Sequence, residues 1–500
     1  MSENLSYICK KNLLMNFHKN KKEFMMLSIL VSLNLGLKIA LRNASLQIWD
    51  DVEYAYRVQH GMLYAHSPGY PGYMILGRIF YLIFSIFTEA RSEQSMILLS
   101  AIFGGLLVIP VYLLIRTLLG NREAIIGSLF VILNPYLAEM SSQALSDISS
   151  VFFVALGVSL LYFGLFKGNV KVILFSAAVY GFSIAIRLTN LIAFPFFLVA
   201  AYSRMRQWSN WRVLTALFLS ISVFCGGITY TPLLYAKGLD GFISFLTEYH
   251  TVNEVTYTIV TMRERILLLI SNLIDSITPV ASVICLIGLY KLFLEHKALF
   301  RDLFIWIFAY LSFFVLYGPA TQINRLSLPA YPAFAVVFAY GLKDQFSKLM
   351  KMPRTGRKLN PITLISCGFI ILVFSSVIIW SVPTYRWLEY YSRNPFRPKL
   401  VALWINRTVP ADSTIIGGPY CWVLQYYMDL PDPSPRLIWS YDSSWITYSV
   451  NERLSEGRRV FTVSEVVERC DFLAENFKLE LYAQYDGTLS LYEILPKSSG

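Results

Sequence analysis

Long apolar stretches recur along this chain and alternate with short, strongly basic segments. Several of these stretches approach 20 residues, the length that an α-helix needs to cross the hydrocarbon core of a bilayer. Hydrophobic residues make up 55% of the 500 residues and charged residues only 15%, whereas a soluble domain is about 25% charged. So much apolar surface cannot be buried in one water-soluble core. The sequence therefore predicts a mostly α-helical polytopic membrane protein.

The positions of the basic residues predict its orientation. The formal net charge is +11, but lysine and arginine cluster between the apolar stretches, as they do in cytoplasmic loops. These clusters all become cytoplasmic if the N-terminus is cytoplasmic and residues 73–87 form an external surface helix. We therefore expect contacts with membrane lipids, no nucleic-acid partner, and about eleven spans with the C-terminus outside the cell membrane. The predicted spans are residues 24–41, 96–115, 123–137, 148–166, 172–186, 188–202, 213–234, 266–294, 303–317, 326–342 and 362–382.

The polar region after the last predicted span has roughly 115 residues, enough for a small domain. Helical and strand patterns alternate in it, and Asp486-Gly487 predicts a closing hairpin. We predict a transmembrane domain over residues 1–382 and an external soluble α/β domain over residues 383–500. Cys421 and Cys470 could form a disulfide there if the region faces an oxidising space. The cysteines form no CxxC pair, so we expect no metal and no other cofactor.

Two adjacent carboxylates, Asp50 and Asp51, follow the first predicted span and would lie outside. Residues 50–64 have the mixed pattern of a helix that lies on a membrane surface. The spacing Asp50-x-x-Glu53 is that of a capping box, but a capping carboxylate can also accept a proton from a bound hydroxyl. Asp147 leaves the same two alternatives open, because it stands at the outer start of a span, where a carboxylate suits the helix dipole.

Arg187 and Arg325 are exceptions to the cytoplasmic location of positive charge. The planar fork of an arginine matches phosphate oxygens, although each could simply contact lipid headgroups. His66, beside a Pro/Gly turn, is a turn or binding residue. Carboxylates and arginines on one side of a membrane favour one reaction class. In it a carboxylate activates an acceptor hydroxyl while arginines stabilise a departing lipid phosphate.

At these positions the chain resembles the GT-C superfamily of integral-membrane glycosyltransferases, which includes protein O-mannosyltransferases and aminoarabinose transferases. The segment Asp50-Asp51-x-x-Tyr54 resembles the start of that family's first external helix. The turn at residues 67–73, SPGYPGY, is similar to the family's Pro-rich turn before a second surface helix. Further similar positions are Asn134-Pro135 followed by Asp147, then Arg187, and Arg325 followed by Pro329 and Pro332.

The resemblance implies that Asp50, or Asp51 as second choice, is the catalytic carboxylate and that Asp147 is a second acidic position of the site. It implies substrate-binding roles for Tyr54, His66, Tyr70, Arg187 and Arg325. The implied reaction transfers a single sugar, with mannose as first candidate, from a polyprenyl- or dolichyl-phosphate donor. The sugar would pass with inversion to a hydroxyl of a protein, glycan or lipid acceptor.

Two other readings remain open from the residues. One is a transporter or flippase of lipid-linked substrates, in which ionisable residues more often lie at mid-span and the two halves repeat. The other is a structural subunit whose external domain binds a partner. The Trp-Trp-Asp motif of oligosaccharyltransferases is absent from the sequence, which argues against transfer of a whole glycan to asparagine.

Overall fold

The structure, a computed structural model, describes most of the chain and divides it into two compact units. We call them the helical unit (Met1–Arg42 and Arg57–Ser392) and the sheet unit (Asn43–Tyr56 and Arg393–Gly500). The N-terminal segment, predicted to be cytoplasmic, lies outside the described residues. The described residues are 21–47, 49–87, 91–206, 208–257, 261–317, 323–349, 361–417, 420–431, 434–438, 443–468 and 470–497.

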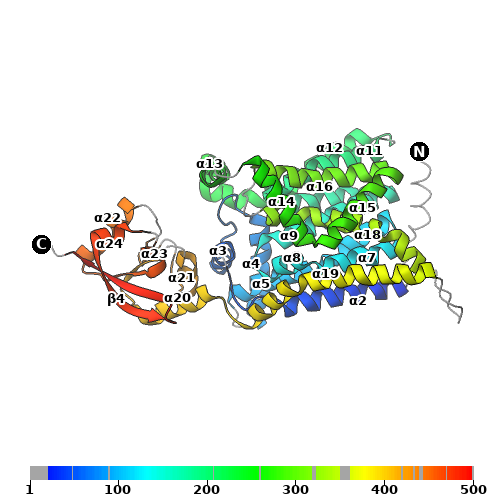
Figure 1. The fold of residues 1–500 in the computed structure, drawn as a ribbon. Helices are drawn as coiled ribbons and strands as arrows, with labels where there is room; N and C mark the ends of the chain where they lie inside the picture. Colours follow the sequence, from blue (N-terminus) through cyan, green and yellow to red (C-terminus); the bar gives the residue numbers. More distant parts are fainter. Residues whose placement is uncertain are drawn as a thin grey trace. The chain divides into compact units, whose positions relative to one another are not determined.

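The helical unit is a bundle of apolar helices, most of which follow one common axis (Figure 1). Among the described residues, seven helices are long and apolar enough to cross a membrane, or up to nine if each bent pair counts as one span. The prediction of a mostly helical polytopic membrane protein is thus confirmed. The elements are α2 (Lys21–Ala40), α4 (Pro71–Phe87), α5 (Ser92–Leu106), α6 (Val108–Leu118), α7 (Asn121–Leu133), α8 (Pro135–Ser142), α9 (Ser146–Lys167), α10 (Val170–Ile186), η1 (Leu188–Ala193), α11 (Phe194–Met205), α12 (Trp211–Gly227), η2 (Ile228–Tyr230), α13 (Thr231–Tyr257), α14 (Met262–Ile277), α15 (Pro279–Glu295), α16 (Lys297–Tyr317), α17 (Ile323–Ser327), η4 (Leu328–Ala330), α18 (Tyr331–Leu349) and α19 (Pro361–Arg393).

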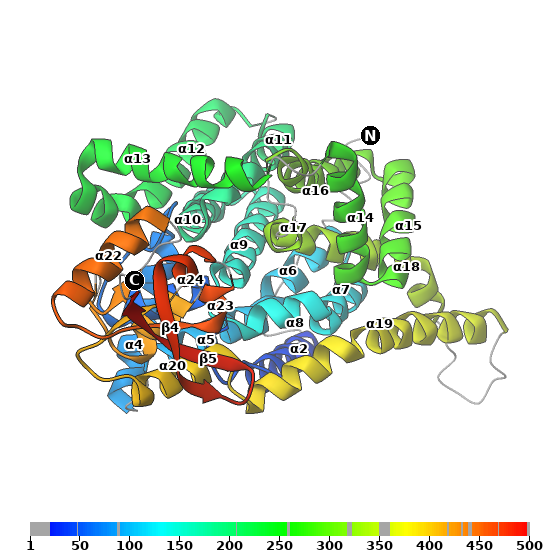
Figure 2. The same cartoon turned by 60° about the vertical axis from the view of Figure 1, so that its left-hand side comes forward.

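Helix α9 lies inside the bundle, against α5, α6 and α8 and also against α10 and α11 (Figure 2). Its ends follow from its sequence. Asp147 stands in the first turn, where the helix dipole favours a negative charge. Lys167 stands in the last turn, and Gly168 ends the helix in the left-handed conformation that glycine adopts readily. At 1.5 Å per residue α9 is roughly 33 Å long, which matches a bilayer core.

Two apolar segments are bent rather than straight. The predicted span over residues 266–294 is not one straight helix, because α14 and α15 meet at an angle of 103°. The bend follows from Pro279, which cannot continue the preceding helix and instead begins the next one after Thr278 at φ 80°. In the same way Pro135 separates α7 from α8, which differ in direction by 56°. Glu139 lies within α8.

The sheet unit contains the predicted small α/β fold. Its strands have the order β2-β1-β3-β5-β4, in which β1 pairs in parallel with β2 and β3, and β5 pairs antiparallel with β3 and β4. The predicted hairpin is present, with Asp486 and Gly487 both at positive φ as its tight turn requires. The elements are α20 (Arg397–Thr408), β1 (Thr414–Ile416), α21 (Cys421–Tyr427), β2 (Leu437–Ile438), α22 (Ser443–Ser455), β3 (Val460–Val463), α23 (Ser464–Val467), α24 (Phe472–Asn476), β4 (Phe477–Tyr485) and β5 (Leu489–Pro496).

Cys421 and Cys470 are both buried thiols and are not joined by a disulfide. Burial raises the pKa of the Cys421 thiol to about 12, so it stays protonated at neutral pH. A buried, protonated thiol packs as a small apolar group. Cys421 therefore contributes packing to the sheet unit.

Helix α3 (Trp49–Gln59) is divided between the two units. Its residues up to Tyr56 group with the sheet unit, although the chain from Arg57 to Ser392 belongs to the helical unit. At the other end of the helical unit, α19 continues past residue 382 to Arg393. The segment that carries Asp50 and Asp51 is therefore a part of the sheet unit.

Candidate functional site

Three of the predicted site residues meet at one end of α9. The Asp147 side chain is fully buried, and its two carboxylate oxygens accept from two different arginines. Arg187 Nη1 donates to Oδ1, and Arg325 Nε donates to Oδ2 at 2.8 Å. The exposed fractions of the arginine side chains are 6% for Arg187 and 11% for Arg325. We call these three residues the Asp147 cluster.

The local structure explains why these charges gather here. Asp147 lies at the N-terminal end of α9, and Arg187 is the C-cap of α10. A helix dipole stabilises an anion at the first of these positions and a cation at the second. Arg325 lies in the last turn of the short helix α17. With one carboxylate facing two guanidinium groups, the Asp147 cluster has a formal excess of one positive charge, which suits a bound anion.

A second polar contact runs beside the Asp147–Arg187 pair. Asn190 Nδ2 donates to Ser150 Oγ at 2.8 Å and to the Ser183 carbonyl at 2.8 Å, and Tyr310 OH donates to Asn190 Oδ1 at 3.1 Å. Ser150 and Asn190 each stand three residues after a member of the cluster. The two contacts therefore fix α9 against the turn after α10. The sequence alone did not single out Ser150 or Asn190. The pattern that could have indicated them is a polar residue three positions after each charged residue.

The Pro-rich turn at residues 67–73, which runs into the start of α4, packs against the same end of α10. A Cβ atom on Gly72 would lie 2.7 Å from Ile186 N, one residue before Arg187. Ser67 Oγ donates to the Phe245 carbonyl at 2.6 Å, which attaches the turn to α13. The ring of His66, directly before the turn, lies 5.2 Å from the ring of Tyr70 within it. The turn with these predicted binding residues is thus held next to the Arg187 backbone.

Gly72→Ala should destabilise the helical unit by about 1–3 kcal/mol, the usual cost of overpacking. The added methyl group would meet backbone atoms of Ala185 and Ile186 at 2.8 and 2.7 Å, which cannot rotate away. Thermal unfolding in detergent measures the effect. Gly36→Ala is the matched control, because no atom lies within 4 Å of its added Cβ in α2. Equal melting temperatures for the two variants would contradict the close approach.

An apolar cavity of about 400 Å³ lies where the end of α10 meets α12 and α13, and Asp147, Arg187 and Arg325 are not among its lining residues. Its lining includes Ile184 and Leu188, which lie three residues before and one residue after Arg187 in the chain. A lining of this composition suits a hydrocarbon chain. The remaining lining residues are Leu191, Ser222, Val223, Gly226, Gly227, Tyr230, Thr231, Leu234 and Phe242.

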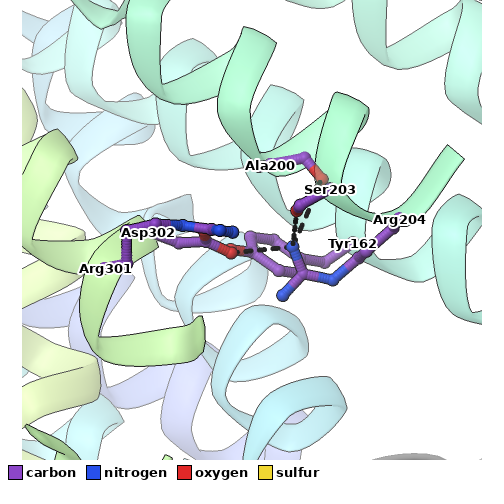
Figure 3. A network of polar contacts seen from close by, with 6 residues as sticks. All are labelled: Tyr162, Ala200, Ser203, Arg204, Arg301 and Asp302. Carbon is purple, nitrogen blue, oxygen red and sulfur yellow. Dashed lines mark hydrogen bonds and ion pairs between the residues drawn. The ribbon is translucent and has the colours of Figure 1, made fainter. Parts of the chain in front are cut away.

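A second cluster with the same composition lies near the other end of α9 (Figure 3). The buried carboxylate of Asp302 accepts from Arg204 Nη1 at 2.7 Å, from Arg301 Nη2 at 2.8 Å and from Tyr162 OH at 2.9 Å. The Arg204 guanidinium also lies 4.8 Å from the centre of the Tyr162 ring. These contacts join α9, α11 and α16. The predicted site does not include this cluster, which provides a matched comparison for the Asp147 cluster.

The other predicted residues lie in α3, in the part that belongs to the sheet unit. Asp51 Oδ2 accepts from the backbone N–H of Gln47 at 2.8 Å, and Asp51 is fully buried. Asp50 lies in the first turn of α3 and is half-buried. Tyr54 is fully buried. Asp51 thus forms a hydrogen bond at the start of the helix, and Asp50 is the more exposed of the two residues.

Within the part of the chain that the structure describes, no group of three or more histidine, cysteine, aspartate or glutamate side chains is arranged to hold a metal ion. Two fully buried carboxylates of the helical unit, those of Asp147 and Asp302, are each paired with two arginines.

Comparisons with known proteins agree with this architecture. Residues 71–229 match the family of dolichyl-phosphate-mannose-protein mannosyltransferases. The structure is similar to that of ArnT from Cupriavidus metallidurans bound to undecaprenyl phosphate, with a TM-score of 0.63, 14% identity, and coverage of 93% of this chain and 97% of ArnT. No curated protein matches the sequence significantly.

A second similar structure is the oligosaccharyltransferase AglB from Archaeoglobus fulgidus in complex with an inhibitory peptide and a dolichol-phosphate. Its TM-score is 0.61 at 13% identity, with coverage of 96% of this chain and 75% of AglB. The apo form of the oligosaccharyltransferase from the same organism gives 0.62 at 14% identity, with coverage of 90% and 70%. The predicted resemblance is therefore confirmed, and the chain has the fold of the GT-C superfamily of integral-membrane glycosyltransferases.

Proposed function

We propose that this protein is a glycosyltransferase that moves a single sugar from a polyprenyl- or dolichyl-phosphate donor to an acceptor hydroxyl. The observation that carries the proposal is the Asp147 cluster. Arg187 and Arg325 are held on one buried carboxylate with an excess of one positive charge, and Ile184 and Leu188, which lie close to Arg187 in the chain, line an apolar cavity. That combination suits a ligand with an anionic head and a hydrocarbon tail.

The two arginines would bind the phosphate of the donor. Their forks match phosphate oxygens, and their attachment to Asp147 fixes them before the donor arrives. The prenyl chain would enter the cavity lined by Ile184 and Leu188. Two of the similar structures support this ligand class, since ArnT was solved with undecaprenyl phosphate and AglB with a dolichol-phosphate.

In the reaction, the carboxylate of Asp50 would take the proton of the acceptor hydroxyl. The hydroxyl oxygen then forms a bond to the anomeric carbon of the sugar, from the face opposite the phosphate. The bond from that carbon to the phosphate oxygen breaks, and its electron pair leaves with the lipid phosphate. The charge gained by the lipid phosphate is stabilised by Arg187 and Arg325. The configuration at the anomeric carbon is inverted.

The burial of the two neighbouring carboxylates favours Asp50 as the base. Asp51 is fully buried, whereas Asp50 is half-buried and so more accessible to an acceptor. Both carboxylate oxygens of Asp147 already accept hydrogen bonds from arginines. We therefore assign Asp147 to positioning the arginines, a narrower role than the one the family resemblance implies for it.

The site would face the outside of the cell membrane. Lys167, Arg204 and Arg301 mark the other end of α9, where the basic loops lie. Because basic loops remain cytoplasmic, the Asp147 end would be external. An external site has no access to cytoplasmic nucleotide sugars, which agrees with a lipid-linked donor. The sheet unit would then be external as well.

The test is to reconstitute the protein in vesicles and add radiolabelled polyprenyl-phosphate sugars one at a time, with peptide, glycan or lipid acceptors. Transfer from at least one lipid-linked sugar and from no nucleotide sugar is the expected result. Movement of the labelled lipid across the bilayer without transfer to any acceptor would instead identify a flippase and overturn the proposal.

A further inference from the structure

The candidate catalytic carboxylate belongs to a segment that packs with the C-terminal part of the chain. Residues 43–56 form one compact unit with residues 393–500, although more than 300 residues of the helical unit separate them in sequence. Asp50 and Asp51 are therefore carried by the sheet unit. This arrangement offers a role for a unit that the proposed reaction does not otherwise use.

Two buried hydrogen bonds fix this segment on both sides of Asp50. Ser45 Oγ accepts from the backbone N–H of Phe396 at 2.7 Å. Tyr56 OH donates to the carbonyl oxygen of Leu430 at 3.0 Å. The Tyr56 ring also lies 6.3 Å from that of Trp422 in a tilted arrangement. Each end of the segment is thus attached to the sheet unit by a polar contact.

The carbonyl that receives the Tyr56 hydroxyl is itself held rigidly. It belongs to the turn after α21, in which Asp429 has a φ of 54°. The Leu430 N–H donates to the Gln425 carbonyl at 2.9 Å, and Gln425 Nε2 donates to the Pro431 carbonyl at 3.1 Å. Both ends of the turn are therefore bonded to one residue of α21. A fixed acceptor gives the Tyr56 contact a single geometry.

From these contacts we infer that the sheet unit sets the position of Asp50, and that Tyr56 is the positioning residue through which it acts. Tyr56 lies on the same helix as Asp50, so a shift at Tyr56 moves the carboxylate with the helix. The inference rests on the proposed function, in which Asp50 takes the proton of the acceptor. It adds that the C-terminal unit is a component of the catalytic apparatus.

Tyr56→Phe in the full-length protein tests the inference, since it removes only the hydroxyl. We expect the kcat for sugar transfer to fall about 10- to 100-fold, because small displacements of a reacting group are costly. The KM for the lipid-linked donor should stay within about twofold, because the donor would bind at the arginines of the helical unit. Because a loss of folded protein also lowers the apparent kcat at an unchanged KM, the kcat is calculated per folded molecule.

The matched control is Tyr162→Phe. Tyr162 is also a fully buried tyrosine whose hydroxyl donates to one oxygen, that of Asp302 in the helical unit. This variant should keep the wild-type kcat. Ser45→Ala is a second test variant, which removes the acceptor at the other end of the segment. It keeps the inference testable if Tyr56→Phe does not accumulate in membranes.

A second measurement needs no donor. Hydrogen exchange of the backbone amides at residues 49–56, followed by mass spectrometry, should accelerate about tenfold in Tyr56→Phe but not in Tyr162→Phe. Unchanged exchange overturns the inference, as does an unchanged kcat in both test variants. If the wild-type protein uses no lipid-linked sugar, the proposed function fails, and exchange alone then decides whether the sheet unit holds this segment.

Discussion

Asp50→Asn is expected to lower sugar transfer by about 10²- to 10⁴-fold, the usual contribution of a general base. The amide has the same shape as the carboxylate but cannot take a proton from the acceptor hydroxyl. The fold should persist, because the loss of one negative charge in the first turn of a helix costs only about 0.3–1 kcal/mol. Initial rates at saturating donor, together with the melting temperature in detergent, measure both parts of this expectation.

Glu264→Gln is the control for a carboxylate that only caps a helix. Glu264 stands in the first turn of α14 and accepts from the Thr261 backbone N–H at 2.7 Å. The Glu264→Gln variant should transfer sugar at the wild-type rate. If the Asp50→Asn variant also transferred sugar at the wild-type rate, Asp50 would be a structural residue of α3 and the proposed base would be wrong.

Asp147→Asn is expected to have the second large effect. Removing this charge leaves two arginines with side chains only 6% and 11% exposed beside a neutral amide. Breaking a buried ion pair from one side typically costs about 3–5 kcal/mol. The arginines would also lose the contact that fixes them, so we expect the kcat to fall about 100-fold. Thermal unfolding and steady-state kinetics separate the two consequences.

The Asp302 cluster supplies the control for stability alone. Asp302 also has a fully buried side chain and also pairs with two arginines, near the opposite end of α9. Asp302→Asn should also destabilise the protein, but less, because the Arg204 and Arg301 side chains are 19% and 44% exposed, and the molecules that remain folded should keep the wild-type kcat. If both variants lowered the kcat equally, the Asp147 cluster would contribute stability and nothing more.

Most of the secondary structure could be predicted because the information for it is local in the sequence. Apolar stretches of nearly span length became helices, and Asp486-Gly487 became a tight hairpin turn. The bend between α14 and α15 was missed although Pro279 stands at it. Continuous hydrophobicity around the proline concealed the interruption, because a hydropathy pattern does not distinguish one straight helix from two that meet at an angle.

Part of the candidate site could also be predicted from local features of the sequence. Asp147, Arg187 and Arg325 are charges at the ends of apolar stretches, and charges are conspicuous there. Asn190 and Ser150 are small polar residues within apolar sequence and gave no comparable signal. The attachment of α3 to the sheet unit depends on Tyr56 and Leu430, which are 374 residues apart. No local pattern encodes a contact over that separation.

Binding of a lipid phosphate tests the central claim most directly. The melting temperature of the purified protein should be measured with dolichyl phosphate and with dolichol, which differ only in the phosphate group. We predict that dolichyl phosphate raises it well above the value with dolichol, since a ligand at 100 times its Kd adds about 2.7 kcal/mol of stability. In Arg325→Met the difference should disappear. Equal melting temperatures of the wild-type protein with the two lipids would contradict a lipid-phosphate site at the Asp147 cluster.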